Sequence, residues 1–410
     1  MKIVYLNSSG QIGGAEGVLL DLLAGLRRSE PAWRLHLIAP VEGPLTERAL
    51  SLGAGVTVSP FAGALARLGD SPAGRRRRPA ALAARLVTAA AAAATHIRRL
   101  RRLLRALAPD LIHSNGLKTH VLAAWAARAP VVWHFHDYVS GRPLAARLLR
   151  LSARGCAMAV ANSASVAADV GGQFGRRLGV RQVHNAVNLE RFSPEGERAD
   201  LDALAGLPPA PAGVVRIGLV ATFARWKGHD TFMRALARLP ADLPVRAYVI
   251  GAALYQTEGS QYGIKELRRM AEGAGVADRV GFTGHAARPE EAMRALDVVV
   301  HASTAPEPFG LVIAEAMACG RAVVASAAGG AAELFTPGRD ALAHRPGDDR
   351  GLADCLARLA YDPALRAALG EAARKTAVAR FDSARMIAEW LPIYRDLAAR
   401  GGGAGGGGRR

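Results

Sequence analysis

Aromatic residues and cysteines are both scarce in this chain of 410 residues. Phe, Trp and Tyr make up 5% of the sequence, whereas hydrophobic residues make up 50%. Alanine supplies much of that hydrophobic share, which is typical of helices packed closely on parallel sheets. Cys156, Cys319 and Cys355 are scattered and include no CxxC pair. This spacing argues against a disulfide framework and a cysteine-based zinc site, and it fits a reducing cytoplasm.

Long hydrophobic runs are missing as well. The alanine-rich stretch 86–97 has about twelve residues before arginines interrupt it, and a membrane-spanning helix needs about twenty. The first residues form a strand pattern that runs into Gly10, which is too short for a signal peptide. We therefore expect a cytoplasmic protein that is at most peripheral to the inner face of the plasma membrane.

Acidic residues are absent from 71–109, a segment that carries ten arginines in a chain of net charge +18. From Ile97 to Leu107 the apolar residues share one helical face and arginines fill the rest. Such a segment suits an anionic membrane, a solvated basic face, or a charged partner or acceptor. Nucleic acid fits less well, because the sequence has no helix-turn-helix pattern, no zinc motif and no aromatic residues among the basic ones. We expect peripheral contact with an anionic membrane through Arg75–Arg105 and no specific binding of nucleic acid.

Short apolar runs alternate with helical patterns along the whole chain, which predicts βαβ units, parallel sheets and, at this length, two α/β domains. The candidate strands are 2–6, 35–39, 55–58, 111–113, 131–135, 157–161 and 183–185, then 215–221, 245–251, 280–282, 298–301, 322–325 and 341–343. In the first half, candidate helices begin at Ala15, Pro44, Ala80, Thr119, Pro143 and Ser165. The predicted parts are an N-terminal domain 1–192, a polar and Pro-rich linker 193–213, a C-terminal domain 214–383, a last helix 384–400 and a disordered Gly-rich tail 401–410.

Two glutamates separated by a turn and a helix start form the most distinctive pattern of the chain. Glu307 precedes a Pro-Phe-Gly turn, and Glu315 lies on the apolar helix that follows. Because a strand is predicted at 298–301, Glu307 lies on a loop at a strand's carboxyl end, where open parallel sheets bind ligands. The N-terminus of the helix offers unpaired N–H groups and a positive dipole end to a phosphate. A ligand with a diphosphate and with hydroxyls on both sides of it would use all of these parts.

The string E-P-F-G-L-x-x-x-E-A-M-A-x-G that begins at Glu307 resembles the signature of glycosyltransferase family 4. The resemblance implies a retaining enzyme of the GT-B fold, in which two Rossmann-like parallel-sheet domains face each other across a cleft. It also implies a nucleoside-diphosphate sugar as the donor. Glu315 would bind the ribose hydroxyls and Glu307 the hydroxyls of the donor sugar. Backbone amides would approach sugar and phosphate at Phe309, Gly310 and Leu311.

Two motifs of the first half also resemble the family. The loop from Gly13 to Glu16 is similar to its G-G-A-E loop, which faces the cleft near the donor phosphates and the acceptor; a tight turn is the alternative interpretation. His136 follows the strand 131–135 and matches a family histidine close to the transferred sugar. Gly13 and Gly14 are thus donor-site candidates, and the acceptor-site candidates are Glu16, His113 and Asn115. The family's last helix crosses back onto the first domain, which is the expected place of 384–400.

A basic segment follows the strand 215–221. Lys227 fits the family pattern, in which a cation before a helix neutralises the departing diphosphate. The usual arginine of that pattern is replaced by Thr222, and Arg225 is the candidate for the missing charge. Gly284 follows the predicted strand 280–282, and the resemblance implies that this position lies near the nucleotide base. We expect Thr222, Arg225, Lys227 and Gly284 to belong to the donor site together with the donor candidates named above. The catalytic candidates are His136, Lys227 and Glu307.

No metal and no tightly bound cofactor is expected. Asp200 and Asp202 invite a metal interpretation, but they lie in the predicted linker instead of at a strand end, and solvated linker charges are the preferred interpretation. The predicted function is transfer of a sugar to a hydroxyl of a glycan or lipid-linked acceptor in cell-envelope polysaccharide or glycolipid synthesis. A nucleotide-sugar epimerase or phosphorylase of the same fold is the nearest alternative. An NAD-dependent oxidoreductase is more distant, because it needs a G-x-G-x-x-G loop that this sequence does not have after its first strand.

Overall fold

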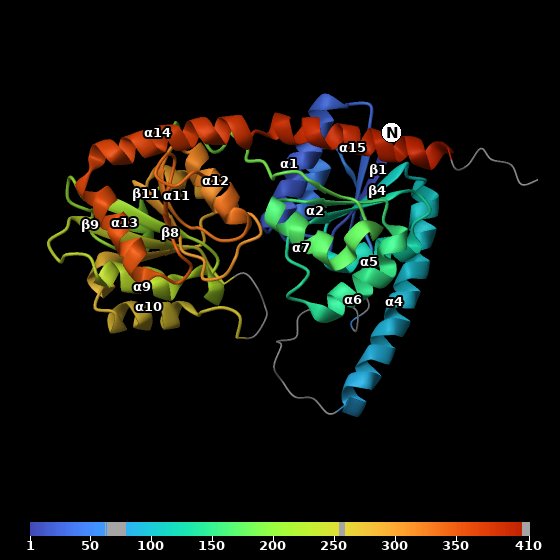
Figure 1. The fold of residues 1–410 in the computed structure, drawn as a ribbon, viewed down its shortest axis with the longest axis horizontal. Helices are drawn as coiled ribbons and strands as arrows, with labels where there is room; N and C mark the ends of the chain where they lie inside the picture. Colours follow the sequence, from blue (N-terminus) through green and yellow to red (C-terminus); the bar gives the residue numbers. More distant parts are fainter. Residues whose placement is uncertain (62, 64–78, 254–258, 404–410) are drawn as a thin grey trace, which may run out of the picture. The chain divides into compact units, whose positions relative to one another are not determined.

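The computed structural model describes residues 1–61, 63, 79–253 and 259–403 of the chain. Contacts divide the chain into two compact units: unit 1 comprises Met1–Ala186 and Ser383–Arg410, and unit 2 comprises Val187–Asp382. Each unit is built around one parallel sheet covered by helices (Figure 1). The predicted α/β class with two Rossmann-like domains is therefore confirmed.

Unit 1 contains a seven-stranded sheet in the order β3-β2-β1-β4-β5-β6-β7. Its strands are β1 (Lys2–Leu6), β2 (Arg34–Ala39), β3 (Gly55–Val58), β4 (Leu111–Ser114), β5 (Val131–Phe135), β6 (Met158–Ala161) and β7 (Val180–Gln182). Its helices are α1 (Gly14–Ser29), α2 (Pro44–Ser51), α4 (Pro79–Leu107), α5 (Leu117–Ala126), α6 (Pro143–Ser152), α7 (Ala164–Phe174) and α15 (Ser383–Gly403).

Unit 2 contains a six-stranded sheet in the order β10-β9-β8-β11-β12-β13. Its strands are β8 (Val215–Val220), β9 (Val245–Ile250), β10 (Val280–Gly284), β11 (Val298–His301), β12 (Ala322–Ser326) and β13 (Leu342–His344). Its helices are α8 (Leu201–Ala205), α9 (His229–Ala237), α10 (Ile264–Gly273), α11 (Pro289–Arg294), α12 (Leu311–Ala318), α13 (Asp349–Tyr361) and α14 (Pro363–Arg380).

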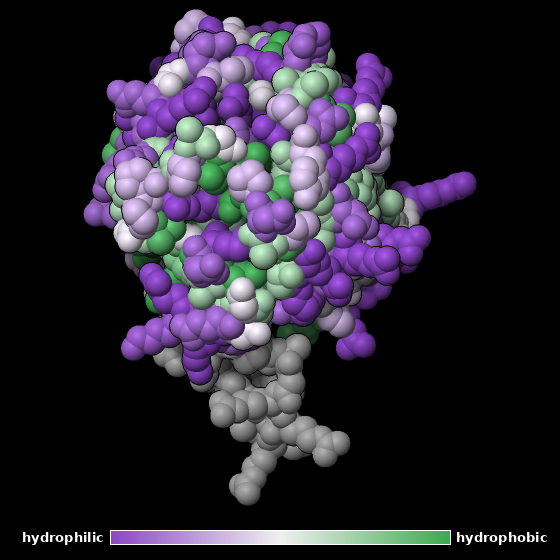
Figure 2. All heavy atoms as spheres, turned by 90° about the vertical axis from the view of Figure 1, so that its left-hand side faces the viewer, coloured by the Kyte–Doolittle hydropathy of each residue, from purple (hydrophilic) through white to green (hydrophobic). Residues whose placement is uncertain are grey.

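The sheet of unit 2 is buried on both faces, which explains its uninterrupted apolar strands. In β11, Val298 and Val300 belong to one hydrophobic cluster and Val299 to the other. A strand covered by helices on both sides needs no polar alternation. The face of unit 2 seen in Figure 2 is mostly hydrophilic, with smaller hydrophobic areas between the polar side chains. None of the described helices is long and apolar enough to cross a membrane.

One expected strand is misplaced. The pattern at 183–185 predicted the last strand of unit 1, but β7 is Val180–Gln182 and pairs with β6 through Ala159 and Val180. Arg181 and Gln182 are exposed on this edge strand, so it carries little of the apolar pattern by which strands are recognised.

The segment 193–213, expected as a linker, lies within unit 2. The chain passes from unit 1 to unit 2 between Ala186 and Val187. Helix α8 lies inside the expected linker and packs against β10, with Leu201 buried. The proline- and alanine-rich composition of this segment is typical of a linker, although helix α8 anchors it in the core of unit 2.

Helix α15 belongs to unit 1, where it packs on α1. A Cβ at Gly25 of α1 would lie 2.4 Å from Cγ1 of Ile387, so the close approach of the two helices requires glycine. Trp390 and Tyr394 of α15 are completely buried. The helix extends to Gly403, and the remainder of the expected tail, 404–410, lies outside the described residues, as does the block Arg75–Arg78.

Candidate functional site

Both sheets have a point at which the strand order reverses, and the site candidates gather at the carboxyl ends of the strands there. In unit 2 the reversal lies between β8 and β11, which pair in parallel. The loop after β8 carries Lys227, and the loop after β11 carries Glu307. In unit 1 the reversal lies between β1 and β4. Ligands of doubly wound sheets bind at such points, because the two connecting segments diverge and leave a crevice.

Lys227 and Glu307 form a buried ion pair. Lys227 Nζ donates to Glu307 Oε1 at 2.6 Å, and both side chains are mostly buried. The ammonium also lies 4.1 Å from the centre of the Trp226 ring, a favourable cation–π contact. Gly228 turns the chain into α9 with φ of 76°, and a Cβ there would lie 1.8 Å from the carbonyl oxygen of Ala302. The position of Lys227 therefore depends on a glycine immediately after it.

The second oxygen of Glu307 is bound from its own loop. His301 Nε2 lies 2.6 Å from Oε2, and Ser303 Oγ donates to the same atom at 2.6 Å. Burial alone would raise the pKa of Glu307, but Lys227 and then His301 more than offset it and hold the pKa below its usual range. The carboxylate is thus charged and held at both oxygens.

Helix α12 begins beside this carboxylate. Gly310 precedes it with φ of 93°, a left-handed conformation suited to glycine. Leu311 is the first residue of the helix, and Glu315, one turn later, is partly exposed. The Phe309 side chain is buried and packs edge-on against Phe381, with ring centroids 6.0 Å apart. Phe309 therefore has only its backbone to offer a ligand, as expected for the amides at this turn.

Arg225 is directed to other partners. Its guanidinium pairs with Glu266 at 3.0 Å, donates to the carbonyl of Gly259 at 3.0 Å and lies over the Tyr262 ring. Thr222 has a buried hydroxyl that finds no hydrogen-bond partner in the part of the chain that the structure describes. Since Arg225 pairs with Glu266, Lys227 and not Arg225 is the basic side chain that contacts Glu307. Gly284, at the end of β10, has φ of 76° and is separated from β8 by β9.

In unit 1 a chain of hydrogen bonds links the expected residues across the strand ends. His136 Nε2 lies 2.7 Å from Asn115 Oδ1, and Asn115 Nδ2 donates to Asn7 Oδ1 at 3.0 Å. Asn7 Nδ2 donates to Glu16 Oε1 at 3.1 Å, and Glu16 Oε2 accepts from the Gly13 amide at 3.1 Å. Glu16 thus closes the first turn of α1, where Gly14 is the first residue.

His136 is neutral, because desolvation lowers its pKa to about 3. The contact with Asn115 Oδ1 assigns the proton to Nε2, so Nδ1 is a hydrogen-bond acceptor. Among the described residues Nδ1 has no partner. Asp137, adjacent in sequence, pairs instead with Arg142. Nδ1 is itself buried, so in this structure a hydroxyl from outside does not reach it.

His113 lies in the core, completely buried between other rings. Its Nδ1 bonds to Tyr394 OH at 2.7 Å, and it contacts His134 and Trp390 with centroid distances of 5.2 and 4.9 Å. Burial lowers the pKa of His113 to about 3, so this imidazole is neutral. This position favours a role in packing α15 onto the sheet over the expected contact with an acceptor.

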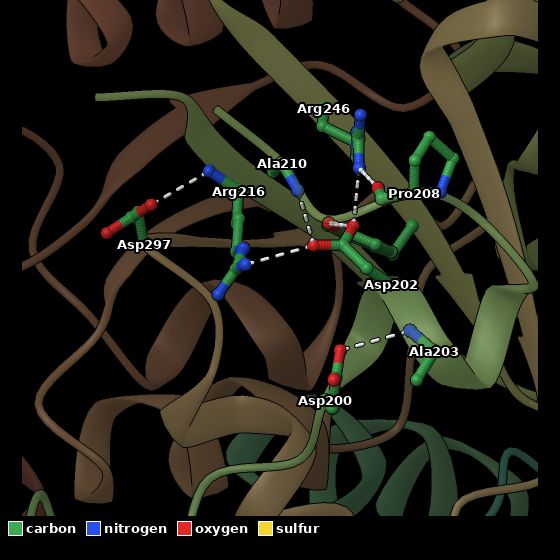
Figure 3. Close-up of polar contacts among 9 residues, drawn as sticks. Asp200, Asp202, Ala203, Pro208, Ala210, Arg216, Arg246 and Asp297 are labelled. Carbon is green, nitrogen blue, oxygen red and sulfur yellow. Dashed lines mark hydrogen bonds and ion pairs between the residues drawn. The ribbon is translucent and has the colours of Figure 1, made fainter. Parts of the chain in front are cut away.

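The expectation of solvated charges at Asp200 and Asp202 is wrong for Asp202. Its carboxylate is buried and accepts from Arg246 at 2.7 Å, from Tyr248 at 2.6 Å and from Arg216 at 3.1 Å (Figure 3). Burial would raise its pKa, but the Tyr248 hydroxyl, the Ala210 amide and Arg246 lower it well below its usual range. Asp200 caps α8 by accepting from the Ala203 amide. The pair anchors α8 to the sheet, and no group of three or more His, Cys, Asp or Glu residues suited to a metal occurs among the described residues.

Sequence reasoning missed three residues of these networks: His301, Ser303 and Asn7. Each ends or follows a strand at the site edge, which is a signal that the sequence contains. The pairing of His301 and Ser303 with Glu307 depends on how the loop folds back, and that is visible only in the structure.

Comparisons with known proteins agree with this geometry. The model of "Glycosyltransferase Family 4" matches residues 12–191, and the model of "Glycosyl transferases group 1" matches residues 210–376. D-inositol 3-phosphate glycosyltransferase 1 of Catenulispora acidiphila is 34% identical over 228 residues, which are 55% of this chain and 53% of that protein. The chain thus spans about half the length of the curated relatives that it matches.

Solved structures match over nearly the whole chain. HepE of Anabaena in complex with UDP is 28% identical, with a TM-score of 0.77 over 97% of this chain and 100% of HepE. HepE has also been crystallised with UDP-glucose. Sucrose-phosphate synthase of Thermosynechococcus elongatus, 20% identical with a TM-score of 0.74 over 97% of this chain and 99% of that one, shares the fold. Since one family model matches most of each sheet unit and the fold is that of GT-B proteins, the chain belongs to the group 1, family 4 glycosyltransferases.

Proposed function

We propose that the protein is a retaining glycosyltransferase that moves a sugar from a nucleoside-diphosphate sugar to a hydroxyl of an acceptor. The Lys227–Glu307 pair at the strand-order reversal of unit 2, beside the start of α12, carries the proposal. A lysine cation and a helix N-terminus suit a diphosphate. A fixed carboxylate suits the sugar hydroxyls.

In this proposal the bond between the anomeric carbon and the diphosphate oxygen breaks, and the same carbon bonds to the acceptor oxygen. Lys227 and the α12 amides stabilise the negative charge that develops on the leaving diphosphate. The diphosphate takes the proton of the acceptor hydroxyl from the same face, so the anomeric configuration is kept. Glu307 holds the sugar and Glu315 the ribose. No protein nucleophile is required by this route.

Uridine is the base that we propose for the donor. The support is HepE, which is similar along its whole length and was crystallised with UDP and with UDP-glucose. We assign neutralisation of the diphosphate charge mainly to Lys227, because it lies beside Glu307 at the strand-order reversal, whereas Arg225 pairs with Glu266 of α10. We propose that Thr222 contributes its hydroxyl, without charge, where related sequences have arginine.

The acceptor is proposed to bind unit 1, where His136, Asn115 and Glu16 belong to one chain of hydrogen bonds at the strand ends. A glycan or a lipid-linked glycan of the cell envelope is the first candidate, in agreement with the basic face of α4. Arg98, Arg99, Arg102 and Arg105 of that helix are exposed and suit anionic headgroups. An inositol phosphate is the second candidate, suggested by the curated relatives named above.

A thermal-shift screen tests the donor proposal. Wild type, Glu315→Ala and the control Glu371→Ala, which alters an exposed glutamate, are heated with a panel of nucleoside diphosphates and nucleotide sugars without added metal. A ligand that binds the native state raises the Tm by mass action. We expect UDP and a UDP-sugar to stabilise wild type and Glu371→Ala but not Glu315→Ala. Stabilisation by NAD alone, or by none of the panel, would refute the proposal.

A further inference from the structure

Helix α6 leaves a stripe of leucines uncovered on the surface of unit 1. Leu144, Leu148 and Leu151 are 54%, 42% and 73% exposed, whereas Ala146 and Leu149 of the same helix are buried. At about 100° per residue the three leucines fall within an arc of about 60°. One isolated exposed leucine needs no explanation, but three on a single helix face form a hydrophobic surface.

Trp125 of α5 extends this stripe. Its ring is 54% exposed, and its indole N–H donates to Ser152 Oγ at 2.8 Å. Ser152 in turn bonds to the carbonyl of Leu148, so the indole is fixed beside the leucines. A tryptophan with its polar end bound and its ring exposed is typical of membrane–water interfaces.

Arginines flank the leucine stripe on one side, and α6 carries no acidic residue. Arg147 and Arg150 of α6 are exposed, and by the same helical angle they lie on one side of the leucines. Neither α6 nor α4 contains an acidic residue. Arg101 of α4 donates to the carbonyl of Trp125 at 2.7 Å, which joins the basic face of α4 to the tryptophan. Figure 1 shows α4, α5 and α6 on the same side of unit 1.

We propose that Trp125, Leu144, Leu148 and Leu151 form a docking surface that inserts into the headgroup region of an anionic lipid bilayer. Arg147 and Arg150 would then bind lipid phosphates at the rim. Hydrophobic side chains on one face with arginines beside them, and no acidic residue on the helix, match the charge and polarity of such an interface. This inference rests on the membrane contact proposed above and adds the side chains that enter the bilayer. Arginines alone hold a protein near a lipid surface, whereas leucines and tryptophan insert. It also makes α6, rather than α4 alone, the membrane-facing element.

Vesicle co-sedimentation tests the docking surface. The variant is Leu148→Gln/Leu151→Gln, and the control Leu50→Gln alters a leucine of α2 that is 57% exposed in the same unit. We expect wild type and Leu50→Gln to bind phosphatidylglycerol vesicles at physiological salt, and the double variant to bind at least tenfold more weakly. Binding to pure phosphatidylcholine should be much weaker for all three proteins.

Three outcomes would overturn the docking surface: no binding of wild type to anionic vesicles, equal binding of the double variant, or a wild-type dimer in solution that the double variant converts to monomer. The last would mean that a second copy of the chain covers the leucines. The Tm and its increase with UDP are measured on the same samples. An unchanged Tm shows that the variant is folded, and the UDP response separates failure of the donor proposal from failure of the membrane surface.

Discussion

Replacing Lys227 by methionine should destabilise unit 2 and impair catalysis together. Lys227 Nζ and Glu307 Oε1 are 2.6 Å apart and both side chains are largely buried. At an effective dielectric constant of about 20 the direct attraction is about 6 kcal/mol. Desolvation cancels part of it, and loss of one partner of a buried pair costs about 3–5 kcal/mol, because the other charge is left uncompensated. We expect that loss in Lys227→Met at pH 7.

The pH dependence has a defined sign. The folded-state pKa of Glu307 lies below its ordinary value, so its contribution to stability is present above the unfolded pKa of about 4.3 and is lost as pH falls through the folded pKa. Lys227 is the largest of the causes that lower this pKa. In Lys227→Met the folded pKa therefore rises, and the difference in stability between wild type and variant should shrink as the pH is lowered from 7 towards 3.

Urea unfolding of wild type, Lys227→Met, Glu307→Gln and the double variant gives the coupling energy directly. The Lys375–Glu371 pair is a matched control, since it has the same 2.6 Å separation but side chains that are 74% and 70% exposed. We expect strong coupling for the buried pair and none that is measurable for the exposed pair. Equal coupling in both cycles, or a Lys227→Met protein as stable as wild type at pH 7, would refute the reasoning.

Three further changes test other parts of the site. Asp202→Asn should lower the free energy of unfolding in urea at pH 7 by about 2–3 kcal/mol. The loss is smaller than for a fully buried pair, because Arg216 is partly exposed. Unchanged stability would contradict the anchoring role of Asp202. His301→Ala should lower kcat about tenfold with a smaller change in KM. His301→Gln can still donate to Glu307 and should recover most of the lost kcat. A change in KM alone would argue that His301 does not position Glu307. Gly228→Ala should lower the free energy of unfolding by more than about 2 kcal/mol and abolish the increase of Tm with UDP. The left-handed φ and the clash with Ala302 should displace the turn that carries Lys227. A normal increase of Tm with UDP would show that this turn does not affect UDP binding.

Much of the fold was predictable from the sequence because the strands of both units are buried. Runs such as Val298–His301 are bounded by loops and followed by helices with clear starts, so local pattern and tertiary position agree. The edge strand β7 and the buried α8 were not predictable. Arg181 and Gln182 have no apolar signal, and the composition around α8 resembles a linker although Asp202 is bound by two arginines in the core.

The sequence indicates where the candidate residues of the site lie along the strands, but not which contacts they make. Strand ends and glycine turns indicate Lys227 and Glu307 in unit 2 and His136 in unit 1, because each residue follows a strand at the carboxyl edge of its own sheet. The partner of Arg225 was not predictable from the sequence, because Glu266 lies on α10, a helix that is distant from Arg225 along the chain. The role of Asn7 in the hydrogen-bond chain to His136 also depends on side-chain directions that no spacing rule provides.

We propose that unit 2 holds one nucleoside-diphosphate site, formed by Lys227 and Glu315. Isothermal titration calorimetry of UDP into wild type, Lys227→Met and Glu315→Ala, in the presence of a chelator, tests it most directly. We expect one UDP to bind per chain of wild type and each variant to bind UDP at least tenfold more weakly. Absence of binding to wild type, or equal affinity in all three proteins, would contradict it.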